Sequence, residues 1–109
     1  MNAKEKNIFE QQGEIVKAIA HPLRIAVVHF LQAGPQCVCD IAEYVNSERS
    51  NVSKHLSIMV KAGVLSSQKK GLKVIYTLKR PCIFEFLGCI TDCLVQQYKE
   101  DSELFEALL

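Results

Sequence analysis

The sequence lacks any apolar run long enough to cross a membrane. A spanning helix needs about 20 predominantly apolar residues, whereas AVVHFL is short and CIFEFLGCI is interrupted by Glu85. The N-terminal stretch MNAKEKNIFEQQGE is polar and lacks the apolar core of a signal peptide. We therefore expect a cytoplasmic protein that has no membrane segment.

The sequence also lacks an even set of cysteines. It has five, and an odd number does not fit a complete set of disulfides. Because cytoplasmic proteins usually keep their thiols reduced, we expect free thiols. The 109 residues, 49% of them apolar, suit a single folded domain over 1–109. A domain of this size has a modest core and often gains stability by association.

Acidic residues are absent from one long stretch of the chain, residues 49–80. Eight Lys and Arg residues lie in that stretch, whereas the rest of the chain carries five basic and twelve acidic residues. The net charge of +1 conceals this segregation. A basic segment without carboxylates is typical of a surface that binds a polyanion. An ordinary solvated basic face would show the same pattern.

Hydrophobic periodicity predicts three helices in the first half of the chain. Apolar residues at helical spacing predict the first helix over residues 4–20. Pro22 is suited to the first turn of a second helix, and Gly34 marks its end. The segment CDIAEYV, residues 39–45, predicts a short third helix.

The second half begins with a fourth helix, predicted over residues 50–62 and ended by Gly63. The β-branched and aromatic residues within 64–78 then predict a β-hairpin with Gly71 near its tip. Pro81 can begin a long final helix. The fold class is therefore mainly α with a small β-hairpin.

Two helices joined by a polar turn and followed by a basic hairpin form a winged helix-turn-helix pattern. In such a unit the N-terminal half of the second helix meets base edges. A cationic hairpin beside the groove suits contact with phosphates. We expect contacts with double-stranded DNA from the polar and cationic side chains at these two places: Ser50, Asn51, Ser53, Lys54, His55, Lys69, Lys70 and Lys73.

Four segments together resemble the ArsR/SmtB family of metal-responsive winged-helix repressors: KAIAHPLRIAVVHFL, CVCDIAEYV, SNVSKHLSIMVKAGVL and KKGLKVIYTL. The resemblance runs from about Ile15 to Val95. It implies a homodimer held by the first and last helices, with dimerisation helices therefore at both ends of the domain. It also implies that the dimer binds a two-fold symmetric operator and releases it when an inducer binds.

The CVC pair, Cys37 and Cys39, resembles the ligand pair of the family's arsenic, antimony, lead and cadmium sensors. Thiolates select soft metals and metalloids, and a helix N-terminus favours the thiolate form. Residues i and i+2 point about 200° apart on a regular helix. An ion held by both sulfurs is therefore expected to distort the start of the third helix. We expect arsenite or antimonite first as the inducer, and cadmium or lead next. Two small buried apolar residues are the alternative.

The resemblance leaves a third ligand unassigned. Arsenic sensors of this pattern can continue as CVCDLC, where this chain has Ala42. Cadmium and lead sensors draw further cysteines from the N-terminal arm, which has none here. The third ligand is expected from elsewhere in the chain, from the other protomer or from a small thiol.

The last helix carries three more cysteines, Cys82, Cys89 and Cys93, on one helical face. Zinc sensors of the family hold a nitrogen- and oxygen-rich site on this helix. At the corresponding spacing this chain has Arg80, Cys82, Cys93 and Gln96, so a zinc or nickel site of that kind is not expected. The three cysteines are a candidate second thiol site, or they pack at the dimer seam.

Other functions stay open. A repressor of this type could instead sense oxidants or sulfur species through the cysteines of the last helix. A constitutive DNA-binding module would keep its DNA affinity when any cysteine is replaced by serine. A thiol enzyme is not expected, because CVC is not a CxxC motif and no His–acid pair lies near the cysteines.

Two histidines of the second helical segment have structural interpretations. His21 directly precedes Pro22 and is expected to cap or space the helix. His29 lies among apolar residues and is expected to be buried.

Overall fold

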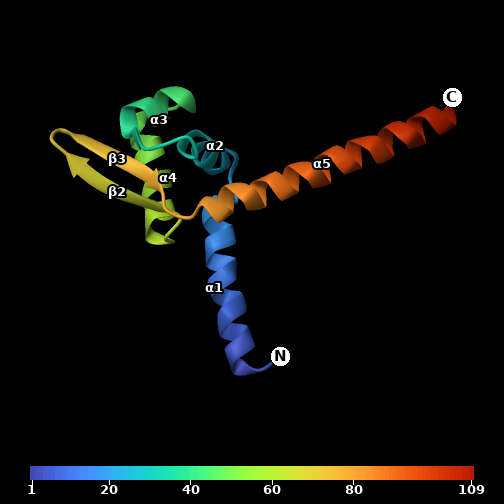
Figure 1. Ribbon diagram of the computed structural model, residues 1–109, viewed down its shortest axis with the longest axis horizontal. Helices are drawn as coiled ribbons and strands as arrows, with labels where there is room; N and C mark the ends of the chain where they lie inside the picture. The colour runs from blue at the N-terminus through green and yellow to red at the C-terminus, as the bar shows by residue number, and fades with distance from the viewer.

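Five helices and a three-stranded antiparallel sheet make up the chain (Figure 1). The computed structural model describes all residues, 1–109. In chain order the elements are α1 (Ala3–Ile19), α2 (Pro22–Leu31), β1 (Gln36–Cys37), α3 (Val38–Tyr44), α4 (Arg49–Lys61), β2 (Leu65–Lys70), β3 (Lys73–Leu78) and α5 (Pro81–Leu108). The predicted winged helix-turn-helix order is confirmed.

Local signals set the ends of several helices. Asn2 accepts a hydrogen bond from the backbone N–H of Glu5, whose carboxylate accepts one from the backbone N–H of Asn2, which is a capping box. His21 Nδ1 accepts a hydrogen bond from the backbone N–H of Leu23 at 3.1 Å, so the expected cap of α2 is confirmed. Gly63 adopts φ 81° just beyond α4, a left-handed conformation that glycine permits.

The sheet has the strand order β1-β3-β2. Strands β2 and β3 form the predicted hairpin, in which Lys70 pairs with Lys73 and Gly71 turns with φ 64°. The sequence did not predict β1, which places Cys37 opposite Ile75 of β3. A strand of two residues has no readable periodicity, so only its pairing with a distant segment defines it.

The core contains only apolar side chains. The largest of the fully buried ones come from α2, α3, α4 and the segment that enters the hairpin: Val27, Val28, Ile41, Val52, Leu56, Met59, Val64 and Leu65. At about 1.5–3 kcal/mol for each fully buried side chain of this kind, these contacts hold α3 and α4 in a fixed arrangement. The helix-turn-helix unit is therefore rigidly mounted on the sheet.

Helices α1 and α5 project away from the winged core in different directions, so the two termini lie far apart (Figure 1). The final helix continues beyond Glu100 to Leu108. Both helices expose large apolar side chains: Ile8, Phe9, Ile15, Val16, Phe86, Ile90, Leu94, Val95, Tyr98, Leu104, Phe105 and Leu108. No helix combines the length and the apolar character that crossing a membrane would require.

Candidate DNA interface and thiol site

Helix α4 is anchored on one side and polar on the other. Val52, Leu56 and Met59 are fully buried and fix the helix against the core. The predicted DNA-contact residues occupy its first two turns, where Ser50, Asn51 and Lys54 are exposed and Ser53 and His55 are half-buried. The N-terminal half of α4 is thus open to a partner, as a reading helix requires.

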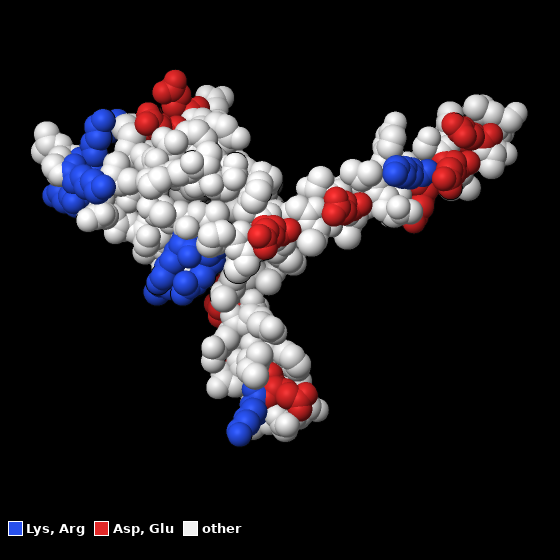
Figure 2. Space-filling view, in the orientation of Figure 1, with Lys and Arg blue, Asp and Glu red and all other residues white.

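The hairpin carries an uncompensated cluster of positive charge. Lys69, Lys70 and Lys73 are all exposed, and Lys70 directly faces Lys73 across the strand pair. Like charges in that position repel, and the one ion pair of the chain, Lys17–Glu14, lies elsewhere. Figure 2 shows Lys and Arg side chains at the hairpin end, whereas Asp and Glu lie along α5 and beside α3. An anionic partner would remove this repulsion.

Two of the predicted base-reading residues already have partners within the protein. Asn51 Nδ2 donates to Ser47 Oγ at 2.9 Å. Arg24 Nε donates to His55 Nδ1 at 3.0 Å, and the ring of His21 lies 4.6 Å from the ring of His55. Burial lowers the pKa of His55, and the charges of His21 and Arg24 lower it further. His55 therefore has only Nε2 free for a base, a restriction that the sequence did not reveal.

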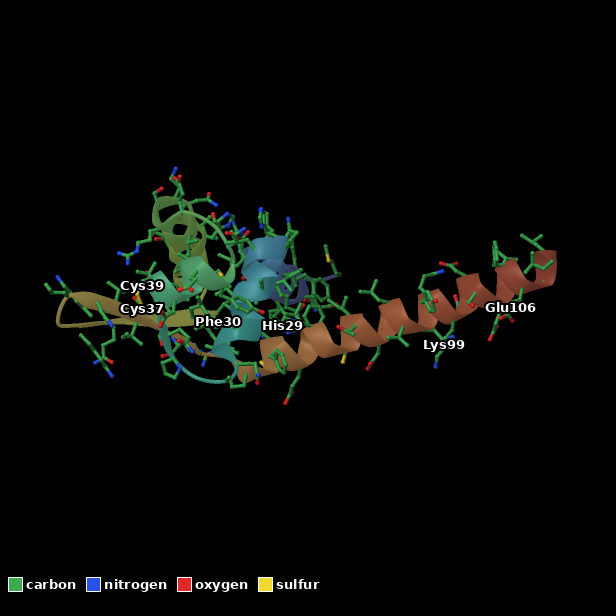
Figure 3. All side chains as sticks on the ribbon, turned by 90° about the horizontal axis from the view of Figure 1, so that it is seen from above. His29, Phe30, Cys37, Cys39, Lys99 and Glu106 are labelled. Carbon is green, nitrogen blue, oxygen red and sulfur yellow. A yellow bond between two sulfur atoms is a disulfide. The ribbon has the colours of Figure 1, made fainter.

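Cys37 and Cys39 lie close together where α3 begins (Figure 3). Their sulfurs are joined in a disulfide, so the expectation of five free thiols is wrong for this pair. Cys37 is 5% exposed and Cys39 is half-buried. Burial of Cys37 agrees with the alternative of a packing role, and a role of the pair in binding a metal stays a prediction.

The expected distortion of α3 by a shared ligand assumed that both cysteines lie on a regular helix, and the structure places Cys37 before the helix instead. Cys37 caps α3 from an extended backbone conformation, φ −78° and ψ 160°, and the two Cα atoms lie 5.4 Å apart. Because Cys37 precedes the helix and does not belong to it, both sulfurs reach the same side while α3 stays regular. The pair is already arranged to share one partner.

Asp40 is the donor residue that sequence reasoning overlooked. Its carboxylate and the sulfurs of Cys37 and Cys39 all lie within 4.8 Å of one another. Its backbone N–H also donates to Cys37 Sγ at 3.4 Å. The position directly after CVC was the available signal, because a residue three beyond an N-cap faces that cap.

The three cysteines of α5 are free and exposed. Along a helix Cys82 and Cys93 are about 16 Å apart, and no cluster of three potential metal ligands includes either of them. The structure therefore does not bring the two predicted thiol groups into one site. A role for Cys82, Cys89 and Cys93 within a dimer stays a prediction.

The predicted burial of His29 is wrong. The side chain is exposed, and its ring lies edge-on to Phe84 of α5 with 5.1 Å between the ring centroids. The apolar neighbours of His29 in sequence lie on other faces of α2, so its own face borders α5 and solvent.

Sequence comparison places the helix-turn-helix region in a known family. The family model described as "Bacterial regulatory protein, arsR family" matches residues 21–67. An uncharacterized HTH-type transcriptional regulator of Methanocaldococcus jannaschii, MJ1325, is 34% identical over 77% of this chain and 96% of its own length. This chain belongs to the ArsR family.

Two further members differ in how much of them the chain covers. The HTH-type transcriptional repressor SmtB of Mycobacterium tuberculosis is 34% identical over 67% of this chain, which spans about half, 54%, of that repressor. The arsenical resistance operon repressor of Staphylococcus xylosus is 27% identical over 79% of this chain and 79% of its own length.

Solved structures agree with the fold. The crystal structure of Rv0081 from M. tuberculosis aligns with a TM-score of 0.74 at 28% identity, covering 85% of this chain and 94% of that one. A homodimeric winged helix-turn-helix DNA-binding domain from Mycobacterium bovis, Mb0332, aligns with a TM-score of 0.78 at 17% identity, covering 89% and 93%. The second likeness shows the fold alone.

Proposed function

We propose that this ArsR-family chain is a homodimeric transcriptional repressor that releases its operator DNA when a soft metal or metalloid binds Cys37 and Cys39. One observation supports it most directly. Cys37 belongs at once to β1, which pairs with the wing strand β3 through Ile75, and to the start of α3 in the helix-turn-helix unit. A ligand at this sulfur would therefore lie where the strand that pairs with the wing meets the helix-turn-helix unit.

DNA binding rests on the polar first turns of α4 and on the lysines of the hairpin. The hairpin lysines have no carboxylate partner in the protein, so phosphates can neutralise them and release counterions. The side chains of α4 supply hydrogen-bond donors and acceptors for base edges. Known members that match this chain are described as transcriptional regulators or repressors, and we propose no catalytic role.

Dimerisation rests on the exposed apolar faces of α1 and α5. Large apolar side chains along two projecting helices are costly in water and are typical of an unpaired interface. The related M. bovis domain is described as homodimeric. Two winged cores joined through these helices would present two α4 helices to two half-sites of one duplex.

Release follows if the ion-bound and ion-free forms differ in affinity for DNA. Helix α3 packs on α4 through buried side chains that include Ile41 and Leu56. A shift of α3 relative to β3, rather than an unwinding of α3, would change the spacing between the reading helix and the wing. Because a close-packed interior has low compressibility and transmits strain, even a small shift of α3 would disturb the positions of both α4 and the wing.

The inducer is proposed from the chemistry of the thiolates. Arsenite and antimonite, and after them cadmium and lead, are soft ions that thiolate pairs bind. Because the chain is similar to an arsenical resistance operon repressor, arsenite is the first inducer to test. The alternative, an oxidant or sulfur sensor built from the cysteines of α5, has less support, because the proteins similar to this chain include an arsenical resistance repressor and a cadmium resistance regulator.

The test uses fluorescence anisotropy of a labelled duplex from the promoter of the gene itself. Reduced protein bound to this duplex is titrated with arsenite, cadmium or lead in the absence of oxygen and added thiol. Release near one or two equivalents per protomer that disappears in Cys37→Ser supports the proposal. DNA that stays bound through an excess of all three ions contradicts it, and Cys89→Ser serves as the matched cysteine control.

A further inference from the structure

A cavity of about 620 Å³ lies where the end of α1, the start of α2 and the end of α4 meet, and neither Cys37 nor Cys39 lines it. Its volume is within the range of about 300–1,000 Å³ that is usual for small-molecule sites. Figure 2 shows a second group of Lys and Arg atoms below the winged core, where α4 ends beside α1. The cavity is therefore a candidate binding site that the thiol pair does not account for.

The charged side chains around this cavity are mainly cationic. Lys17, Arg24 and Lys61 line it together with a single carboxylate, that of Glu14, so positive charge is in excess by two. Lys17 Nζ lies 3.9 Å from a Glu14 oxygen, and the two side chains are 80% and 74% exposed, so this ion pair contributes little. Cations held around one cavity repel one another. An anion inside the cavity would remove that repulsion.

Arg24 presents hydrogen-bond donors whose direction is already fixed. Its Nε donates to His55 Nδ1 at 3.0 Å, and its Nη1 donates more weakly to the backbone carbonyl of Lys17 at 3.5 Å. A guanidinium carries five N–H groups, so three of them have no partner within the protein. Because the fork of a guanidinium matches the spacing of phosphate oxygens, Arg24 is prepared to bind such a group.

The rest of the cavity lining is apolar and comes from Ala18, Ile58 and Ala62. Apolar walls lower the local dielectric constant and so strengthen the attraction between the cations and a bound anion. These walls offer no side-chain hydrogen bond to a neutral polar ligand. The lining therefore favours a compact group that carries strong negative charge.

We propose that this cavity binds a phosphate group, held by the free N–H groups of Arg24 and by the charges of Lys17 and Lys61. The inference goes beyond the proposed metal response, because no residue of the cavity belongs to the thiol site. A bound phosphate would contact one cation from each of three helices. It would thus hold the proposed dimer helix α1 against the reading helix α4.

The phosphate can belong to the DNA backbone or to a free phosphate compound. Lys61 lies ten residues beyond Asn51 on α4, which is about 15 Å along the helix. The major groove is about 12 Å wide, so a backbone phosphate at the edge of the groove can reach the cavity while Asn51 lies near the bases. The cavity is also large enough to hold a free phosphate compound.

The first test titrates the protein with inorganic phosphate while sodium chloride keeps the ionic strength constant. The Nε–H signal of Arg24 in the NMR spectrum reports on the cavity, and it should shift until the site is saturated. Lys61→Gln should weaken the affinity about twofold to fivefold, the range of one exposed charge pair, and Glu14→Gln should strengthen it by a similar factor. Lys99→Gln, which removes the same charge from an exposed position far along α5, should leave it unchanged.

The second test distinguishes the DNA backbone from a free phosphate compound by anisotropy titrations of operator and random duplexes at several salt concentrations. If a backbone phosphate fills the cavity, Lys61→Gln should reduce the salt slope by about one on both duplexes. DNA should then shift the Arg24 Nε–H signal. If a free compound is the ligand, Lys61→Gln should leave the salt slope unchanged while inorganic phosphate still shifts that signal.

The Arg24 signal decides the outcome. A signal that neither inorganic phosphate nor DNA shifts would overturn the inference, even if Lys61→Gln reduces the salt slope, because Lys61 would then contact DNA outside the cavity. Neither test contains a metal, so failure of the metal response leaves this inference standing. Failure of phosphate binding likewise leaves the metal response to be judged by its own titration.

Discussion

His55 shows how a single residue can serve two elements. It lies on the reading helix, yet its ring accepts a hydrogen bond from Arg24 of α2 and rests near His21. No other side-chain-to-side-chain hydrogen bond joins distant parts of the chain. This contact therefore stabilises the position of α4 while limiting what His55 can offer to DNA.

The lowered pKa of His55 predicts that stability falls on acidification. The folded state binds a proton at His55 less readily than the unfolded chain, whose ordinary value is 6.5. The contribution is fully present above about pH 6.5 and is lost as the pH falls through the lowered folded value. Thermal unfolding followed by circular dichroism should show a smaller drop in Tm from about pH 7.5 to about pH 5.5 for His55→Gln than for the unmodified chain.

His29→Gln serves as the control for this measurement, because His29 is exposed and outside the cluster of His21, Arg24 and His55. Its pH dependence should match that of the unmodified protein. Identical pH profiles for all three proteins would show that the Arg24–His55 contact does not govern the response.

The Cys37–Cys39 disulfide predicts that oxidation blocks metal uptake. One equivalent of hydrogen peroxide takes two electrons and two protons from the thiols, forms the sulfur–sulfur bond and leaves two waters. The oxidised protein should then bind no Cd²⁺ at Cys37 and Cys39, and operator DNA should stay bound when metal is added. Alkylation with mass spectrometry identifies the oxidised residues, and retention of Cd²⁺ binding at that site after complete oxidation would contradict the prediction.

At the scale of elements, α4 and the hairpin have different tasks in the proposed complex. The side chains of α4 offer hydrogen bonds suited to base edges, while the hairpin offers charge. This division predicts different signatures for substitutions in the two elements, even though all of the residues concerned lie on accessible surface.

Replacing Lys70 with Ala should weaken binding to operator and random DNA alike and reduce the salt slope by about one. Replacing Asn51 with Ala should cost about 1–3 kcal/mol on the operator only, if its amide leaves Ser47 Oγ to read a base. Anisotropy titrations on both duplexes at several salt concentrations check the contrast. Equal losses on both duplexes for Asn51→Ala would exclude base reading by that residue.

At the scale of the whole molecule, the winged core folds around one small hydrophobic cluster while α1 and α5 extend beyond it. Only Leu87 of the residues of α5 is buried. Helix α5 has 28 residues and only one buried side chain, so contacts within the single chain contribute little to its stability. We therefore infer that a second protomer covers its apolar face.

Leu94→Lys should prevent dimer formation without unfolding the winged core, because Leu94 is 65% exposed in the single chain. Analytical ultracentrifugation should show a monomer, and operator affinity should fall because the two half-sites are no longer bound together. Gln97→Lys, which introduces the same charge at an exposed polar position of α5, is the control. A Leu94→Lys protein that stays dimeric would place the interface elsewhere.

The sequence by itself determined the features that depend on neighbouring residues. His21 caps the start of α2 through a hydrogen bond from the backbone of Leu23. Gly63, just beyond α4, and Gly71, in the hairpin turn, adopt positive φ angles that glycine permits. Residues 49–80 contain no Asp or Glu, so α4 and the hairpin carry a net positive charge wherever the fold places them. These local and compositional features are read directly from the chain and predicted the fold class, whereas the family was predicted from the resemblance of four sequence segments.

Only the tertiary structure decided the features that join distant segments. Pairing of Cys37 with Ile75 created β1, and packing of α2 on α4 brought Arg24 to His55. The extended backbone of Cys37, which precedes α3, allowed the two sulfurs and Asp40 to converge. Such contacts depend on where the whole chain places each backbone, and hydrophobic periodicity carries no information about that placement.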